Sequence, residues 1–320
     1  MSEIAASPPP TGDDADRASG ARGQDQDVLP GDERLSYHVV DVFAVDGQPF
    51  TGNPLAVVLD GEHLSTTQMQ TLAREFALSE TAFPLPAQAA GADYRLRIFT
   101  PEQELPFAGH PSVGSAWVLS SLGRLPAHST TVRQECGAGV LPVRFLVGGQ
   151  VEITGANPFA GPPVDPTALV EACGLEVSDV TQWPARLCGT GVSYFVVAVR
   201  PAALGAAVAD LARLRALQAP VFLLSWSEGT VHARMFAPGL GVPEDPATGS
   251  AVTALGAWLA ENAMIPAEGE VAFEVRQGAE IGRPSVLLGR VVTSGGRAVE
   301  CAVAGAVALV ARGQVAVPPD

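Results

Sequence analysis

The chain contains no lysine: all 19 basic residues among its 320 are arginines. A Schiff-base lysine, and with it pyridoxal phosphate held in the usual way, is therefore excluded. A P-loop is excluded as well, because that phosphate-binding motif needs a lysine. The net charge of −15 also argues against nucleic acid as a partner, since such binding depends on a basic surface.

Cysteines and histidines are few and scattered. The four cysteines, Cys136, Cys173, Cys188 and Cys301, are not at metal-ligand spacing, and a chain of this size does not need disulfides. The five histidines likewise show no zinc-like spacing. These two patterns predict no metal site.

Long apolar runs and common enzyme motifs are also missing. No run approaches the ~18 apolar residues of a membrane span. The N-terminus lacks the basic and apolar segments of a secretory signal, so we expect a cytoplasmic protein with no membrane partner. There is no Gly-x-Gly-x-x-Gly after a strand and no Gly-x-Ser-x-Gly elbow, which excludes a nucleotide-binding fingerprint and a serine hydrolase.

What the chain does contain is a repeated stretch. Residues 97–101 (RIFTP) correspond to residues 234–238 (RMFAP), and residues 110–116 (HPSVGSA) to residues 245–251 (DPATGSA). Both blocks recur in the same order, which predicts two related halves. Each copy has the pattern of a strand, a loop and the start of a helix.

The two predicted helix starts suggest a binding site. Proline is favoured at the first helical position, so His110 and Asp245, which precede Pro111 and Pro246, are predicted as N-caps. A helix N-terminus offers free N–H groups and a partial positive charge, which hold carboxylates. If the halves face each other, both termini converge on one cleft.

The remaining pattern predicts the organisation of the chain. Residues 1–34 form an acidic tail without apolar periodicity, which we expect to be disordered. Strands outnumber helices, and this order fits an α+β protein of two similar domains, 35–150 and 151–302. Further helices are predicted from Ser65, where Gln68 completes a capping box, and over residues 166–173 and 204–214.

Two polar residues keep alternative interpretations at this point. Glu80 follows a helix end and is flanked by apolar residues. It is either an exposed acid at a strand edge or a partly buried one whose raised pKa suits general acid–base chemistry. Asn53, before Pro54, is either part of a turn or a site amide.

Several motifs together resemble the phenazine-biosynthesis PhzF-like family. They run in the family's order and extend over about residues 37–314. The matching segments are residues 52–57 (GNPLAV), 78–83 (LSETAF), 97–101 (RIFTP), 105–111 (LPFAGHP), 244–251 (EDPATGSA), 277–278 (QG) and 282–285 (GRPS).

This resemblance implies a diaminopimelate-epimerase-like fold. Two pseudo-symmetric domains each wrap a curved, mostly antiparallel sheet round a central helix, with the site in the cleft between them. In that fold the last strand often returns to the first domain, a place that residues 303–315 would take. The resemblance also implies a homodimer and no cofactor.

The family's name-giving enzyme isomerises trans-2,3-dihydro-3-hydroxyanthranilate to its ketone form by moving a proton. Its catalytic acid/base matches Glu80, and its histidine and aspartate match His110 and Asp245. The residues implied to hold the substrate carboxylate and amine are Gly109, Thr248, Gly249 and Ser250, with Asn53 and Ser79 nearby.

The resemblance thus predicts a cofactor-independent isomerase whose Glu80 shuttles a proton within a small cyclic or amino acid carboxylate. Epimerases of this fold use two cysteines at the helix starts, where this chain has residues 108–110 (AGH) and 245–247 (DPA). A two-thiol racemase is therefore disfavoured. Two alternatives stay open: an epimerase or lyase acting on another amino acid, and a ligand-binding protein without turnover.

Overall fold

The computed structural model describes residues 33–227 and 230–319, and residues Arg34–Asp320 form one compact unit. The predicted acidic tail, residues 1–34, lies outside the described residues except for its last two, of which Arg34 begins the first strand. Within the described part of the chain, no helix is both long and apolar enough to cross a membrane.

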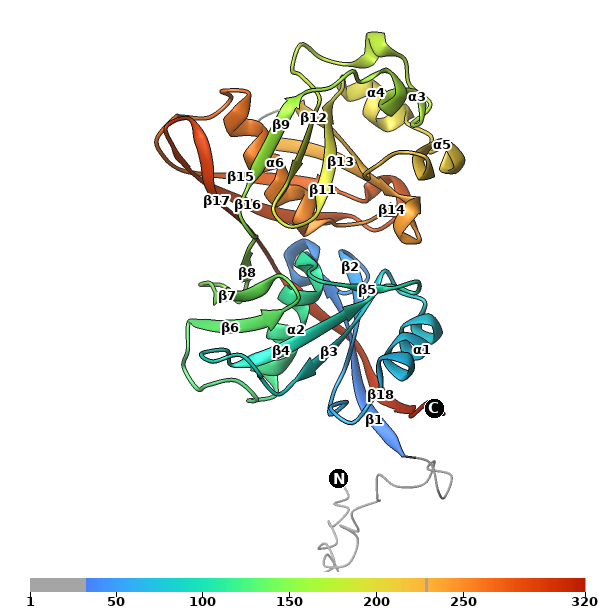
Figure 1. Ribbon diagram of the computed structural model, residues 1–320, viewed down its shortest axis with the longest axis vertical. Coiled ribbons are helices and arrows are strands. Elements are labelled where there is room, and N and C mark those ends of the chain that lie inside the picture. Colours follow the sequence, from blue (N-terminus) through green and yellow to red (C-terminus); the bar gives the residue numbers. More distant parts are fainter. Residues whose placement is uncertain (1–32, 228–229, 320) are drawn as a thin grey trace, which may run out of the picture. The chain divides into compact units, whose positions relative to one another are not determined.

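The first half of this unit is a set of strands with two inserted helices (Figure 1). Its elements are β1 (Arg34–Val42), β2 (Asn53–Val58), α1 (Thr66–Phe76), β3 (Glu80–Leu85), β4 (Tyr94–Phe99), β5 (Glu104–Leu105), α2 (Gly109–Ser121), β6 (Thr131–Cys136), β7 (Gly139–Phe145) and β8 (Val151–Thr154). Strands β2 and β3 pair in parallel, as do β4 and β6, and the other pairings within this half are antiparallel.

The second half repeats this pattern. Its elements are β9 (Phe159–Pro163), α3 (Thr167–Glu171), β10 (Arg186–Gly189), β11 (Ser193–Ala198), α4 (Pro201–Ala206), α5 (Leu211–Arg215), β12 (Val221–Ser227), β13 (Thr230–Ala237), β14 (Val242–Asp245), α6 (Gly249–Glu261), β15 (Gly269–Gln277), β16 (Ser285–Ser294), β17 (Arg297–Gly305) and β18 (Val307–Ala316). Strands β11 and β12 are parallel, as are β13 and β15, so each parallel pair of the first half has a counterpart here. The sequence repeat is thus a repeat of topology.

The halves are linked by their final strands. β8 pairs with β17, so the two sheets join edge to edge. The chain then leaves β8 to place β9 on β10, and it leaves β17 to place β18 along β1. The last strand therefore lies on the sheet of the first half, although the predicted domain boundaries themselves stay a prediction.

The two central helices, α2 and α6, are almost entirely buried by the strands round them (Figure 1). Small residues on these two helices let the surrounding strands pack close to them. A Cβ atom on Gly114 would lie 2.6 Å from Leu55, and one on Gly256 would lie 3.0 Å from the Cys301 sulfur. A helix that is apolar on all sides is typical of such a core position. The α+β class predicted from the sequence is confirmed.

Three local predictions have different outcomes. The capping box at α1 is confirmed, because Ser65 accepts from the Gln68 N–H and Gln68 accepts from the Ser65 N–H. The single helix predicted over residues 204–214 is wrong: α4 and α5 replace it. Arg234 donates to the carbonyls of Leu204 and Ala207 at the end of α4, and Asp210 caps α5. The helix predicted over residues 166–173 is the shorter α3.

Candidate active site

The first turns of α2 and α6 meet. A Cβ atom on Gly109 would lie 3.1 Å from the Ser250 nitrogen and 3.2 Å from the Gly249 Cα. The N-caps are Ala108 and Thr248, and neither cap side chain satisfies a free N–H group of its helix. Both helix starts therefore keep unpaired donors and a partial positive charge where they converge.

The prediction that His110 and Asp245 are the N-caps is wrong. His110 is the second residue of α2. Asp245 ends β14, and the chain makes a further turn before α6 begins. The side chain of Gln277 holds that turn: its Nε2 donates to the Asp245 carbonyl (2.7 Å), and its Oε1 accepts from the Thr248 N–H (3.2 Å).

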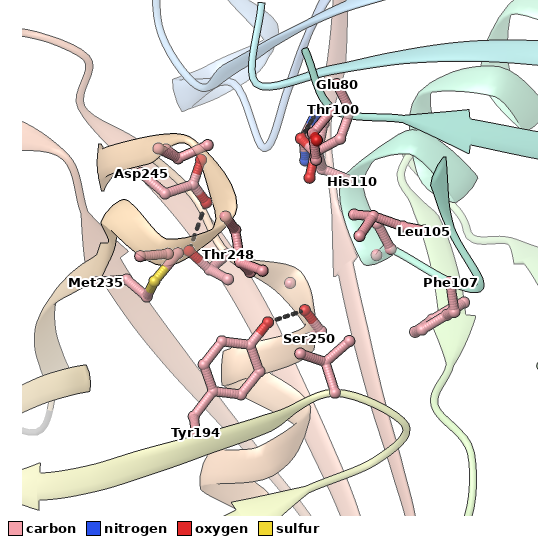
Figure 2. A pocket seen from close by; sticks show the side chains of 17 residues that line it. Glu80, Thr100, Leu105, Phe107, His110, Tyr194, Met235, Asp245, Thr248 and Ser250 are labelled. Carbon is pink, nitrogen blue, oxygen red and sulfur yellow. Dashed lines mark hydrogen bonds and ion pairs between the residues drawn. The ribbon is translucent and has the colours of Figure 1, made fainter. Parts of the chain in front are cut away.

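A cavity of about 110 Å³ lies at this junction (Figure 2). It is lined by Glu80, Thr100, Leu105, Phe107, Ala108, Gly109, His110, Val192, Tyr194, Met235, Ala237, Leu240, Val242, Asp245, Thr248, Gly249 and Ser250. Apolar walls with a few convergent polar groups are typical of small-molecule sites. An apolar cavity that holds benzene has ~150 Å³, so this smaller volume is that of a site for a small molecule only.

Glu80 and His110 occupy one side of the cavity (Figure 2). The Glu80 Oε2 and His110 Nε2 atoms are 3.3 Å apart, and the two side chains are 14% and 4% exposed. Burial, with the nearby charge of Asp245, raises the pKa of Glu80 well above its usual range. Burial lowers the pKa of His110 to about 3. Of the two interpretations of Glu80, the partly buried acid with a raised pKa is confirmed.

Asp245 belongs to the other half of the repeat. Its Oδ2 accepts from the Thr248 hydroxyl (2.5 Å) and its Oδ1 from the Asn53 amide (2.8 Å). Burial raises its pKa to about 6, although the hydrogen bonds from Thr248 and Asn53 act in the opposite direction. Asp245 therefore carries a charge above about pH 6.

Asn53 and Ser79, predicted near the substrate, lie behind Asp245 and do not line the cavity. Asn53 is fully buried. Its Nδ2 donates to Asp245 and to the Ala247 carbonyl (2.9 Å), and its Oδ1 accepts from Ser79 (3.2 Å). The other predicted residues, Gly109, Thr248, Gly249 and Ser250, all line the cavity with Glu80, His110 and Asp245.

The sequence interpretation missed two residues, Tyr194 and Gln277. Tyr194 is buried on β11, and its hydroxyl lies 2.7 Å from the Ser250 Oγ (Figure 2). Burial raises its pKa. The alternation of residues 191–199 (GVSYFVVAV) could have pointed its side chain inward, and Gln277 stands inside one of the matching motifs.

No cysteine lines the cavity. Burial raises the pKa of Cys173, Cys188 and Cys301 to about 12, so these thiols stay protonated. Among residues 33–227 and 230–319, no group of three or more His, Cys, Asp or Glu side chains is placed to hold a metal ion. The two-thiol chemistry of racemases therefore has no counterpart in this cavity.

Known proteins and solved structures resemble the chain along most of its length. The trans-2,3-dihydro-3-hydroxyanthranilate isomerase of Pseudomonas aeruginosa is 36% identical over 288 residues, which are 87% of this chain and 98% of that protein. The structure of a PhzF-family phenazine biosynthesis protein from Bacillus anthracis superposes with a TM-score of 0.80 at 25% identity, over 88% of this chain and 99% of that one.

A hydroxyproline epimerase from Agrobacterium vitis shares the fold, with a TM-score of 0.61 and 17% identity over 89% of this chain and 94% of that one. The predicted fold of two pseudo-symmetric halves is confirmed by these structures. The model of the PhzC-PhzF family, described as "phenazine biosynthesis-like protein", matches residues 40–313, which are nearly all of the described chain. The chain therefore belongs to the phenazine biosynthesis-like (PhzC-PhzF) family.

Proposed function

We propose that this protein is an isomerase that moves a proton from one carbon to another within a small cyclic or amino acid carboxylate, with Glu80 as the shuttle. The isomerase class is that of its relatives in the family. The proposal needs no cofactor, because the proton leaves one atom of the substrate and returns to another. Trans-2,3-dihydro-3-hydroxyanthranilate, on which the Pseudomonas relative acts by name, is the first substrate to test.

The observation that carries this proposal is the Glu80 carboxyl group at the cavity wall. It is largely withdrawn from water and has a raised pKa, so it exchanges a proton at a pH nearer neutrality than an exposed glutamate does. A general base works best when its pKa lies near the working pH. The His110 Nε2 atom lies 3.3 Å from the Glu80 carboxyl group, and burial lowers the pKa of His110 so that its ring stays neutral.

The proposed reaction has two steps. The ionised Glu80 removes a proton from an activated carbon of the substrate, and the electron pair of that C–H bond enters the conjugated system. Glu80, now protonated, delivers the proton to another carbon of the same system and becomes ionised again. Atoms and charge balance without an added oxidant or reductant.

The helix starts would hold the substrate during these steps. The unpaired N–H groups at Gly249 and Ser250 suit a carboxylate. Asp245, which is ionised above about pH 6, suits a substrate amine. Two fixed points at opposite ends of a small molecule would leave its reactive carbons facing Glu80, and such positioning contributes to catalysis in its own right.

The test is proton NMR of the purified protein with trans-2,3-dihydro-3-hydroxyanthranilate in deuterated water. We expect conversion, with deuterium entering the ring. Glu80→Gln should lower kcat by about 10²–10⁴-fold, the usual contribution of general acid–base catalysis. Glu75→Gln is the matched control, because it makes the same chemical change on the exposed face of α1.

Each outcome decides between specific alternatives. Full activity of Glu80→Gln would disprove the assigned role of Glu80. Binding of this compound without conversion would discard it as the substrate, and the same experiment would then be run with other small cyclic amino acids. If these also bind without exchanging deuterium, the protein is a ligand-binding protein and not an isomerase.

A further inference from the structure

The buried side chain of Asn53 connects the two polar sides of the cavity. It begins β2 in the first half, yet it contacts Asp245 and Ala247 of the second half and His110 at the start of α2. Asn53 is fully buried, and the substrate cavity lies on the far side of the residues it contacts. Asn53 therefore contacts two residues that line the cavity without lining it itself.

The contacts of Asn53 fix which way its amide points. The Asp245 carboxylate (2.8 Å) and the Ala247 carbonyl (2.9 Å) are acceptors, so they require the NH₂ group. The Ser79 hydroxyl donates to Oδ1 on the opposite side (3.2 Å). The amide nitrogen consequently also faces His110 Nδ1, at 3.4 Å.

This arrangement determines where a neutral His110 carries its proton. A proton on Nδ1 would point at the Asn53 amide nitrogen, which is not an acceptor and whose two hydrogens already go to Asp245 and Ala247. A proton on Nε2 would have Glu80 Oε2, 3.3 Å away, as a neighbouring acceptor. Both of these atoms are buried and neither forms a hydrogen bond with any described residue, so each is available to satisfy the other. The surroundings of both ring nitrogens thus favour the same tautomer.

We infer that Asn53 is a positioning residue that holds His110 as the Nε2–H tautomer, so that His110 donates to Glu80 Oε2 and leaves Glu80 Oε1 as the oxygen that carries the shuttled proton. The inference about the shuttle rests on the proposed function, but the tautomer does not. In this arrangement His110 supports the ionised base and does not compete with it for the substrate proton. A second group that fixes the tautomer of a histidine is a recurring device in enzyme sites.

The experiment reads the tautomer directly in the ligand-free protein. Nitrogen-15 NMR of the ring nitrogens distinguishes a protonated from an unprotonated position, and His110→Gln identifies the signals of His110. We expect protonated Nε2 and unprotonated Nδ1 throughout pH 5–8. A protonated Nδ1, or a ring that is charged in this range, would overturn the inference.

A variant then connects the tautomer to turnover. Asn53→Ala removes the amide nitrogen that faces Nδ1, so the His110 signals should shift toward a mixture of tautomers. We expect kcat to fall by about 10–100-fold, the loss seen when a histidine-orienting partner is removed from metal sites, with little change in KM. The matched control is Asn262→Ala on the C-cap of α6, which bonds to Arg186 and should change neither the His110 signals nor kcat.

The outcomes separate this inference from the proposed function. If Asn53→Ala keeps the Nε2–H signals and the wild-type kcat, Asn53 does not set the tautomer. If Glu80→Gln is active but the wild-type ring carries its proton on Nε2, the tautomer assignment stands and only the shuttle fails. Should Asn53→Ala not fold, the wild-type spectrum still decides the tautomer.

Discussion

Replacing Asp245 by asparagine should remove the pH-dependent cost of burying its charge while impairing its site. Asp245 is 6% exposed, and burial raises its pKa from about 3.9 to about 6. The folded state therefore binds more protons at this group than the unfolded state does at intermediate pH. The stability that goes with the protonated form is fully present below about pH 4 and is lost as the pH rises through about 6.

The size of this effect follows from the two pKa values. Each pH unit between them corresponds to about 1.36 kcal/mol, so ionising Asp245 in the folded protein costs about 3 kcal/mol by pH 7. Asp245→Asn cannot ionise and avoids that cost. The substitution also removes the Asp245 charge, which helps to raise the pKa of Glu80. The pKa of Glu80 should therefore fall, and this too makes the variant more stable relative to wild type as the pH rises.

The assay is urea denaturation of wild type and variant between pH 4 and pH 8. Tryptophan fluorescence and circular dichroism should give coincident transitions before free energies are compared. We expect the variant's free energy of unfolding, relative to wild type, to rise by about 2 kcal/mol from pH 4 to pH 7. A difference that stays flat would refute the reasoning about burial.

A control with the opposite shift strengthens this test. Hydrogen bonds from the Thr167 side chain and backbone lower the pKa of Asp165, which is exposed. An acid whose pKa is lower in the folded than in the unfolded state stabilises the protein at pH values above its unfolded-state pKa. That contribution is lost as the pH falls. The difference between Asp165→Asn and wild type should therefore be flat from pH 5 to pH 8 and change only below about pH 4.

Three further substitutions test other parts of the structure. Gly109→Ala places a methyl group 3.1 Å from the Ser250 nitrogen, so it should lower both activity and stability, the latter by about 1–3 kcal/mol in urea; Gly205→Ala, with nothing within 4 Å, should not. Tyr194→Phe removes the partner of the Ser250 hydroxyl and should cost about 1 kcal/mol of stability and raise KM in steady-state kinetics. Ser65→Ala removes the α1 cap and should cost about 1 kcal/mol without affecting kcat.

Much of the fold could be predicted because its determinants are local. The two copies of the repeat predicted two helix starts that converge, and the close approach of Gly109 to Gly249 and Ser250 agrees with this. The capping box at Ser65 depends on residues three apart, so its prediction was safe. The homodimer and the cytoplasmic location depend on partners and surroundings and stay predictions.

The parts that were predicted wrongly depend on contacts between distant residues. The turn after Asp245 is held by Gln277, which the chain supplies 32 residues later, so the motif alone suggested the wrong cap. The break between α4 and α5 needs Arg234 from β13. The place of Asn53 behind the cavity is set by Asp245, 192 residues away. No local pattern contains such information.

The exchange of final strands has a consequence for how the protein is made. On the ribosome, β1 is among the first strands to emerge, but its partner β18 is translated last. Until then one edge of β1 stays unpaired, and unpaired strand edges are where nascent chains associate wrongly. The first half cannot complete its sheet before β18 has been made. A chain that terminates before Val307 would therefore keep an open edge permanently, however well its second half had folded.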